Sequence, residues 1–299
     1  MGQTIACANQ KGGVGKTTTV VNLGSYLALG GERVLIIDLD PQGNATSGLG
    51  IDRNLLRSTA YDAVVDAVAL ADLVLDTAVE GLRLVPSSIA LAAAEVELGP
   101  IEQRERRLAR LLAPIRDRYD YVLIDCPPSL GLLTINALTA ADSVLVPVQS
   151  EYYALEGLGQ LIATVDLVRD HLNPDLRIKG VLITMADART NLSVEVAAEV
   201  RRHLGDLVFD TVIPRNVRLS EAPSHGQPIH RYRPDSPGAA AYRALAAELV
   251  DRDRPPVAVM ASDDRPAAAI PAASAGDFVA TTTPRQIEAA EPVPVGVRR

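Results

Sequence analysis

The sequence has few residues of several kinds, and each scarcity excludes a class of protein. It contains two cysteines in 299 residues, Cys7 and Cys126, and both fall inside short apolar runs. No C-x-x-C pair or other metal-binding spacing occurs, which excludes an iron–sulfur carrier and favours buried thiols in a reducing compartment. No stretch approaches the roughly 18–20 consecutive apolar residues of a transmembrane helix. No basic-then-apolar leader precedes the first apolar run, so we expect a cytoplasmic protein.

Lysine is the scarcest charged residue. The chain carries 29 lysines and arginines against 37 acidic residues, a net charge of −8, and this balance gives no overall attraction to nucleic acid. Only three of the basic residues are lysines, and Lys11 and Lys16 lie together in one glycine-rich stretch. In a chain that otherwise uses arginine, this placement indicates a need for compact ammonium groups rather than planar guanidinium groups.

Short apolar runs alternate with amphipathic segments along residues 1–250. The runs predict buried strands at 4–8, 34–39, 82–86, 121–126, 143–148, 178–184 and 207–213. The amphipathic segments predict helices at 16–29, 102–118, 154–170, 192–204 and 238–250. This alternation is typical of an α/β protein with a doubly wound, mostly parallel sheet flanked by helices, in which ligands bind beyond the carboxyl ends of the strands.

Residues 251–299 have a different composition. They include seven prolines and eleven alanines, with scattered charge and no sustained periodicity. Such a segment buries too little apolar surface to fold alone. We therefore predict one domain over residues 1–250, followed by a disordered tail over 251–299.

The stretch 10–18 follows the first predicted strand and opens the first predicted helix. Phosphate-binding loops read G-x-x-x-x-G-K-[ST], and here only the first glycine is missing, replaced by Gln10. Backbone N–H groups of the loop, together with the positive end of the helix, suit a phosphate. Lys16 is expected to neutralise the β- and γ-phosphates, and the Thr17 hydroxyl is expected to bind Mg²⁺. The predicted nucleotide contacts are Gly13, Val14, Gly15, Lys16, Thr17 and Thr18.

Two further predicted strands end in aspartates that face the same edge of the sheet. In "LIIDLDPQGNAT" (35–46), Asp40 is placed to orient a water or a magnesium-bound ligand near the γ-phosphate, and Asp38 is expected to support the metal indirectly. The strand that ends at Asp125 supplies the acidic partner of such loops, which holds Mg²⁺ through water. The Pro-Pro pair and Gly131 that follow form a segment whose backbone could respond to the γ-phosphate. The predicted metal contacts are thus Thr17, Asp40 and Asp125.

Several motifs occur together and in order. The loop is followed by D-x-D-P-Q-G-N at 38–44, by D-C-P-P at 125–128, and by "VLITMADARTNLSVEVAAEVRRHLGD" and "TVIPRNVRLSEAPSHGQPI" between 181 and 229. This pattern resembles the ParA/MinD group of deviant Walker A ATPases within the P-loop NTPases, and specifically the chromosome-partitioning, Soj-like ParA proteins. The resemblance covers about residues 3–250 and leaves the tail outside.

The resemblance implies a homodimer that forms when ATP is bound. In this family the early lysine of the loop, here Lys11, reaches the ATP of the partner protomer, so that two ATP molecules are enclosed between two protomers. A charge that contacts a triphosphate in a water-poor interface gains more than it does in bulk solvent. Lys11 and Gly12 therefore join the expected nucleotide contacts, with Asp125 acting through magnesium. Lys11, Lys16 and Asp40 are the expected catalytic residues of a Mg²⁺-dependent ATP hydrolase with slow intrinsic turnover.

The resemblance also supplies contacts that the residues alone do not indicate. Pro214 and Asn216 in "IPRN" match the pair that holds adenine. Arg189 and Arg218 match positions that contact DNA in Soj-like proteins, within a region whose charge is only modestly positive. No recognition-helix pattern appears, so we expect binding to double-stranded DNA without sequence preference, and a location on the nucleoid. A ParB-type centromere-binding protein is the implied partner that stimulates hydrolysis and releases the DNA.

Two other functions share these motifs in part. A ParA-like ATPase that positions another cargo, or partitions a plasmid, has nearly all of them, and the sequence separates it poorly from a chromosomal protein. A MinD-like regulator that binds membranes needs a C-terminal amphipathic helix with basic and bulky apolar faces. The Ala/Pro-rich end offers neither face, so no membrane partner is expected.

Overall fold

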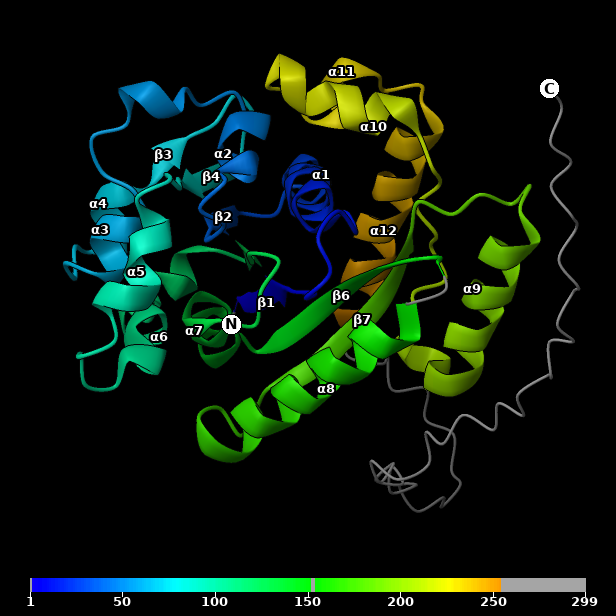
Figure 1. Ribbon diagram of the computed structural model, residues 1–299. Helices are drawn as coiled ribbons and strands as arrows, with labels where there is room; N and C mark the ends of the chain where they lie inside the picture. The colour runs from blue at the N-terminus through cyan, green and yellow to red at the C-terminus, as the bar shows by residue number, and fades with distance from the viewer. Residues whose placement is uncertain (1, 152–153, 254–299) are drawn as a thin grey trace, which may run out of the picture. The chain divides into compact units, whose positions relative to one another are not determined.

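A seven-stranded sheet runs through the computed structural model, which describes residues 2–151 and 154–253 (Figure 1). The strand order is β3-β4-β2-β5-β1-β6-β7, and every neighbouring pair is parallel except the β3–β4 pair at one edge. The strands are β1 (Gln3–Cys7), β2 (Val34–Asp38), β3 (Leu75–Asp76), β4 (Leu82–Val85), β5 (Tyr121–Asp125), β6 (Ser143–Gln149) and β7 (Arg177–Thr184). The predicted doubly wound α/β fold is confirmed.

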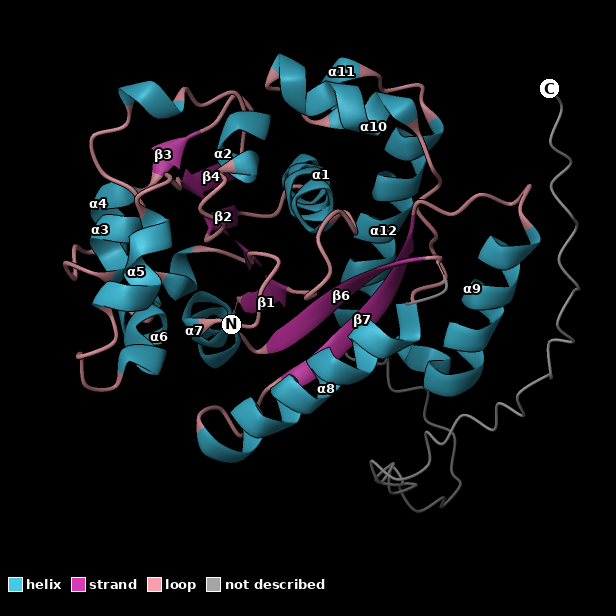
Figure 2. Cartoon of the chain, in the orientation of Figure 1, coloured by secondary structure: helices cyan, strands magenta, loops and turns pink. Residues whose placement is uncertain are grey.

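Helices cover both faces of the sheet (Figure 2). They are α1 (Lys16–Leu29), α2 (Asn44–Gly48), α3 (Ala60–Val64), α4 (Leu70–Leu73), α5 (Leu91–Glu97), α6 (Arg107–Leu112), α7 (Leu132–Ala140), α8 (Ala154–His171), α9 (Asn191–Leu204), α10 (Val217–Glu221), α11 (Ile229–Tyr232) and α12 (Pro237–Asp253). Short 3₁₀ turns lie at η1 (Arg53–Leu55), η2 (Arg104–Arg106), η3 (Arg116–Arg118), η4 (Gly205–Leu207) and η5 (Ala222–His225). No helix in the described part of the chain is both long and apolar enough to cross a bilayer.

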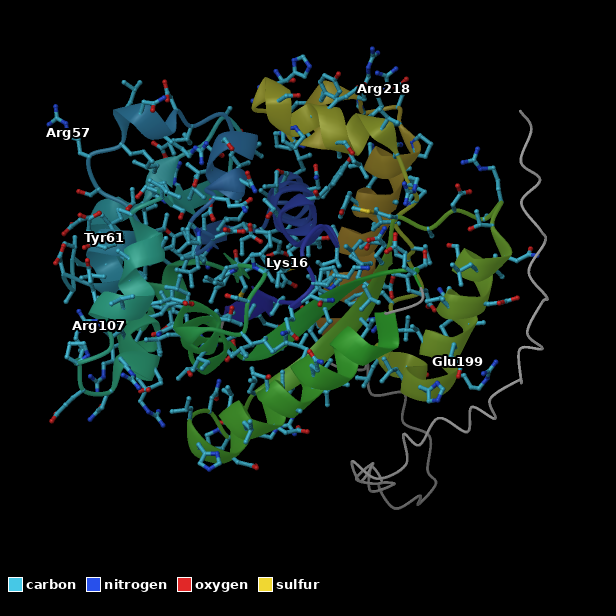
Figure 3. The ribbon with its side chains drawn as sticks, viewed as in Figure 1. Lys16, Arg57, Tyr61, Arg107, Glu199 and Arg218 are labelled. Carbon is cyan, nitrogen blue, oxygen red and sulfur yellow. The ribbon has the colours of Figure 1, made fainter. Side chains whose placement is uncertain are left out.

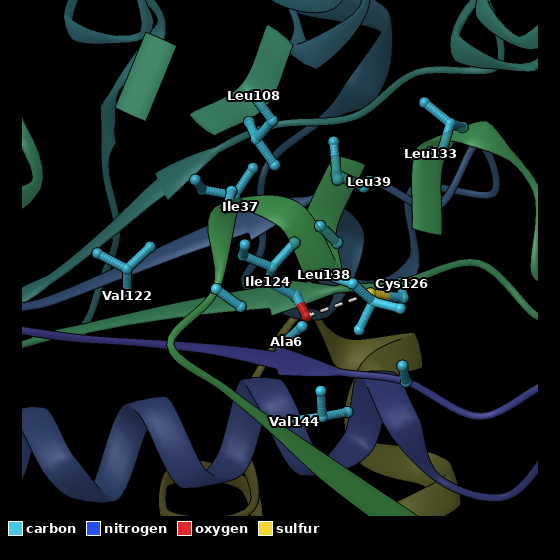
Figure 4. Close-up of a cluster of buried hydrophobic side chains, with 14 of the residues drawn as sticks. Ala6, Ile37, Leu39, Leu108, Val122, Ile124, Cys126, Leu133, Leu138 and Val144 are labelled. Atoms are coloured by element: carbon cyan, nitrogen blue, oxygen red, sulfur yellow. Dashed lines mark hydrogen bonds between the residues drawn. The ribbon is translucent and has the colours of Figure 1, made fainter. Parts of the chain in front are cut away.

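Alternate residues of the central strands belong to two separate hydrophobic clusters, because successive side chains of a strand point to opposite faces of the sheet. Ile37 packs with Leu108 of α6 and Leu138 of α7 in one cluster (Figure 4). Ile36 packs on the other face with side chains of α1 and α12. Strands buried on both faces appear in the sequence as continuous apolar runs, which is why periodicity located them.

The two cysteines are buried thiols, as predicted. Cys7 belongs to the cluster under α1, whereas Cys126 belongs to the opposite cluster, so their side chains lie on different faces of the sheet. Burial raises the pKa of both thiols, and the nearby Asp125 raises it further. Neither cysteine is therefore a reactive thiolate at neutral pH.

Two predicted elements are wrong. The segment 207–213 is not a continuous strand. Val208 forms an isolated bridge to β7, and the Phe209 and Ile213 N–H groups each donate to a carbonyl of β7 at 2.9 Å. Between them, the N–H groups of Asp210 and Thr211 donate to Glu248 at 2.8 and 2.9 Å. The predicted helix 102–118 is instead divided into η2, α6 and η3. Pro114 follows the end of α6 and cannot continue its helical hydrogen-bond ladder toward η3.

The last helix extends beyond the predicted domain boundary. Helix α12 ends at Asp253, so the first three residues of the predicted tail belong to it. The rest of the predicted tail, 254–299, lies outside the described residues. The division into a domain and a disordered tail therefore stays a prediction.

Candidate nucleotide-binding site

The glycine-rich loop between β1 and α1 adopts backbone angles that require glycine. Gly13 and Gly15 have φ values of 75° and 88°, in the left-handed region that a side chain would strain. Gly15 directly precedes α1, so the free N–H groups of the helix start lie beside the loop. Val14 is buried and its carbonyl accepts a hydrogen bond from the Thr184 hydroxyl at 2.8 Å. Val14 therefore anchors the loop with its side chain and can offer a ligand only its backbone.

Lys16 lies at the start of α1 with its ammonium folded back on the loop. The ammonium donates to the carbonyl of Lys11 at 3.2 Å, and only 6% of the residue is exposed. Figure 3 places Lys16 near the centre of the molecule. A phosphate in the loop would therefore meet an ammonium that is already positioned.

A cavity of about 430 Å³ opens over the loop, a size typical of small-molecule sites. One wall comes from the glycine-rich loop and α1, a second from the turn after β2, and a third from α10 and the residues after it. The lining residues are Gly12, Gly13, Gly15, Lys16, Thr17, Thr18, Val21, Asn22, Asp40, Gln42, Asn44, Ser47, Gly48, Pro128, Met185, Leu219, Ser220, Ala222, Pro223 and Gln227.

The carboxylate of Asp125 is buried at the end of β5 and has no hydrogen-bond partner among the described residues. Burial raises its pKa well above the ordinary value, and repulsion from Asp38 raises it further. The Thr17 hydroxyl lies near enough to favour the charged form, without meeting it in a hydrogen bond. An unpaired buried carboxylate next to a hydroxyl and a phosphate loop is a site that a cation would complete.

The same edge of the sheet suits magnesium rather than a metal held by protein groups alone. The described residues contain no cluster of three side chains able to hold a metal ion. Magnesium usually takes one or two carboxylates together with waters and phosphate oxygens. Thr17 and Asp125, with Asp40 in the adjoining wall, fit that pattern.

Asp38 and Asp40 have different tasks in the turn after β2. Both oxygens of Asp38 are occupied: Oδ2 accepts from the Thr46 N–H at 2.8 Å and from its hydroxyl at 2.7 Å, and Oδ1 accepts from the Asp40 N–H at 3.2 Å. Burial raises the pKa of Asp38 to about 6. Asp38 therefore fixes the turn. Asp40 lines the cavity, and its Oδ1 accepts from the Gln42 N–H at 2.9 Å.

Lys11 does not line this cavity. Its ammonium lies 2.8 Å from Glu151, which follows β6, and 38% of its side chain is exposed. Its N–H donates to the Asn9 side chain at 3.0 Å, which fixes the backbone at the edge of the loop. Two lysines five positions apart thus point to different places, and only Lys16 faces the chain's own phosphate site.

The predicted adenine contacts lie apart from the cavity lining. Pro214 forms an isolated bridge with Ala186. The Asn216 side chain caps α10 by accepting from the Arg218 N–H at 2.8 Å. Their role toward adenine stays a prediction. Sequence reasoning missed the wall formed by Leu219, Ser220, Ala222, Pro223 and Gln227, although the Pro- and Gly-containing string "EAPSHGQP" marks this segment as a turn.

The segments that carry the predicted DNA contacts are joined by their backbones. The Ala186 N–H donates to the Ile213 carbonyl at 3.0 Å, and the Arg215 N–H donates to the Ala186 carbonyl at 2.9 Å. The loop that carries Arg189 thus lies beside the segment that leads to Arg218. Figure 3 shows Arg218 at the outer surface of the molecule, well away from Lys16.

Comparison with known proteins decides the family. A family model described as an AAA domain matches residues 2–178. The sporulation initiation inhibitor protein Soj of Bacillus subtilis is 61% identical over 249 residues, which cover 83% of this chain and 98% of Soj. The chain belongs to the ParA family of P-loop ATPases. The chromosome partitioning protein ParA of Caulobacter vibrioides is 53% identical over 254 residues, 84% of this chain and 95% of that protein.

Solved structures of similar fold hold nucleotides and magnesium. A protein described as cobyrinic acid a,c-diamide synthase from Mycobacterium smegmatis, with bound ADP and magnesium, has a TM-score of 0.73 and 41% identity, over 84% of this chain and 94% of that one. MinD from Pyrococcus horikoshii with Mg-ADP has a TM-score of 0.69 and 26% identity, over 83% and 96%. This ParA-family chain has the loop, the buried carboxylate and the cavity for the same ligands.

Proposed function

We propose that this ParA-family ATPase partitions a chromosome or a plasmid by binding DNA as an ATP-dependent dimer and leaving it after hydrolysis. The observation that carries the proposal is the placement of Lys11. Its ammonium, paired with Glu151, lies at the edge of the phosphate loop but outside the cavity of its own chain. A second protomer that faces this edge would bring its own triphosphate within reach of that ammonium, and the arrangement is reciprocal in a two-fold dimer.

ATP and ADP differ in how they would support this dimer. A triphosphate carries one phosphate more than a diphosphate, and this is the phosphate that the partner protomer's Lys11 would contact. An ammonium that contacts this phosphate in an interface with little water gains more than it does in bulk solvent. Lys11 therefore makes dimer formation depend on bound ATP.

The residues of the cavity have separate roles in hydrolysis. Asp40 orients the attacking water, and Lys16 with the partner protomer's Lys11 stabilises the charge on the transferred phosphoryl group. Thr17, Asp40 and Asp125 would hold magnesium, which neutralises phosphate charge when it is bound. Adenine would lie between these groups and the segment that contains Pro214 and Asn216. Slow unstimulated turnover would keep the protein on DNA until a ParB-type partner accelerates hydrolysis.

The DNA surface is formed by exposed arginines near Arg189 and Arg218. One protomer offers few of them, and a dimer doubles the number on one assembly. Because each neutralised phosphate releases counterions, affinity rises steeply with the number of contacts and falls steeply with salt. The contacts are to phosphates, so binding would not depend on base sequence and would place the protein on the nucleoid. Arg201 and Arg202 of α9 are weaker candidates for the same surface.

A DNA mobility-shift assay with ATP, with ADP and without nucleotide, at two salt concentrations, tests the proposal. We expect a shift with ATP alone, for DNA of any sequence, which weakens as salt rises. Equal binding in all three nucleotide states would remove the link between ATP and DNA. Absence of binding to any DNA would contradict the proposal as a whole.

A further inference from the structure

Each of the two arginines proposed to contact DNA is already paired with a carboxylate of its own segment. Arg189 forms a two-pronged pair with Asp187, with Nη2–Oδ2 at 2.7 Å and Nε–Oδ1 at 2.8 Å. Arg218 donates to Glu221 at 2.7 Å, and the Tyr232 hydroxyl donates to the same carboxylate oxygen at 3.0 Å. On α9, Arg202 also forms an ion pair, with Glu199.

Each carboxylate accepts from guanidinium N–H groups that could otherwise bind a phosphate. A guanidinium binds carboxylates and phosphates with the same planar, two-pronged geometry. Both carboxylates are charged at neutral pH, because the paired arginine lowers the pKa of Asp187 to about 2 and that of Glu221 below its usual range. Each arginine–carboxylate pair therefore has no net charge, and a DNA phosphate has to displace or share a carboxylate to reach the guanidinium.

Arg215, in the segment that leads to Arg218, is not paired in this way. Arg215 is exposed, and none of the described acidic residues forms an ion pair with it. It lies near enough to Asp187 to stabilise its negative charge. The backbone of Arg215 is also hydrogen-bonded to the loop that carries Arg189. Arg215 is thus a third cationic group on the surface, and it lacks a carboxylate competitor of its own.

We propose that Asp187 and Glu221 are built-in competitors of DNA phosphate, which hold the DNA affinity of one protomer low. This inference rests on the proposed function, because it assumes that DNA binds at Arg189 and Arg218. With both arginines neutralised by their neighbours, one protomer has little net positive charge to offer. Two protomers bring twice as many contacts, so DNA that one protomer binds too weakly can still be held by the dimer.

Two charge-neutralising variants separate the competitors from the fold. Asp187→Asn keeps an oxygen that can accept from the Arg189 N–H and Nε, as Oδ1 does, and loses the acceptor for Nη2. Glu221→Gln keeps an oxygen that can accept from Arg218 and the Tyr232 hydroxyl. Each removes one negative charge beside its arginine. Asp166→Asn is the matched control, because Asp166 pairs with Arg169 on α8 at 2.9 Å, a similar exposed ion pair in another part of the fold.

The test measures the affinity of each full-length variant for a mixed-sequence DNA duplex with ATP over a series of salt concentrations. We expect Asp187→Asn and Glu221→Gln to bind about three- to tenfold more tightly than wild type, since two exposed pairs are released per dimer. The slope of log affinity against log salt should become steeper, by up to about 0.9 for each freed arginine that contacts a phosphate. Asp166→Asn should match wild type in both measurements.

The outcomes distinguish the inference from the proposed function. Wild-type binding that depends on ATP, together with both variants binding no more tightly than Asp166→Asn, overturns the competitor role and leaves the DNA function standing. Absence of DNA binding by wild type and by every variant overturns both. Thermal unfolding and ATP binding of each variant show that the protein is folded. Because the two carboxylates lie on different segments, one variant still decides the question if the other misfolds.

Discussion

The ammonium of Lys11 lies 2.8 Å from Glu151, a residue 140 positions away in the chain. The second oxygen of Glu151 accepts from the Gln149 side chain at 2.5 Å, so this carboxylate is held in place at the end of β6. In a single protomer the charge of Lys11 is thus satisfied within the chain. To reach the nucleotide of another protomer, Lys11 has to leave Glu151.

Replacing Glu151 with Gln should make the dimer easier to form. The exchange of partners no longer separates opposite charges, and exposed pairs of this kind contribute about 0.2–1 kcal/mol. We expect the ATP-dependent dimer to form at about two- to fivefold lower protein concentration, measured by sedimentation. Glu105→Gln, which removes an equal charge beside Arg104, is the control. A dimerisation constant that matches this control would show that Glu151 does not restrain Lys11.

Lys16→Ala should abolish nucleotide binding, whereas Lys11→Ala should leave it nearly intact in the single protomer. The reason is that only Lys16 faces the cavity, while Lys11 points to Glu151. Titration with a fluorescent ATP analogue measures both affinities. Unchanged affinity in Lys16→Ala would refute the assignment of the phosphate loop, and equal losses in the two variants would refute the separate roles of the two lysines.

Asp40→Ala should bind ATP but fail to hydrolyse it, so that an ATP-bound dimer stays on DNA. Asp40 lies in the cavity wall with one oxygen held by the Gln42 N–H, which leaves the carboxylate able to orient a water. Turnover should fall by about 100-fold or more, because the attacking water is no longer oriented. Phosphate release and DNA retention after ATP addition are the measurements, with Asp72→Ala as a control at an exposed position of α4. Normal turnover would remove Asp40 from the reaction.

Magnesium binding in the presence of ATP should weaken as the pH falls. Burial and Asp38 raise the pKa of Asp125, so this carboxylate holds a proton at a higher pH than an ordinary aspartate does. A ligand has to lose its proton before it binds a metal, so apparent affinity falls as the pH is lowered toward that raised pKa. Isothermal titration between about pH 8 and pH 6 measures the slope. Asp125→Asn should bind magnesium weakly and with a smaller slope, and a wild-type affinity independent of pH would contradict this role.

The fold was largely predictable because buried parallel strands give continuous apolar runs. The strands at β1, β2, β4, β5, β6 and β7 lie within a residue or two of their predicted positions. Segment 207–213 has the composition of a strand but is not a continuous one, since two N–H groups in its middle donate to Glu248, a residue of α12 that local sequence cannot reveal. Strand β3 spans only Leu75–Asp76 and is too short to give any periodic signal.

The parts of the site whose chemistry sets residue type and spacing were predictable from the sequence. The parts whose position depends on tertiary contacts were less predictable. Gly15, Lys16 and Thr17 follow a spacing that a phosphate cradle requires, and the structure places them in one cavity. The partner of Lys11 was not predictable, because Glu151 comes from a distant strand end. The cavity wall formed by the short segment 219–227 was not predictable either, because it depends on how that segment folds back over α1.

The oligomeric state with a non-hydrolysable ATP analogue and with ADP tests the central claim most directly. Sedimentation of the full-length protein with magnesium and each nucleotide gives this state without any DNA or partner protein. The account predicts a dimer with the triphosphate and a monomer with the diphosphate, and loss of that dimer in Lys11→Ala. A monomer in both nucleotide states, or a dimer that forms equally well without Lys11, would contradict it.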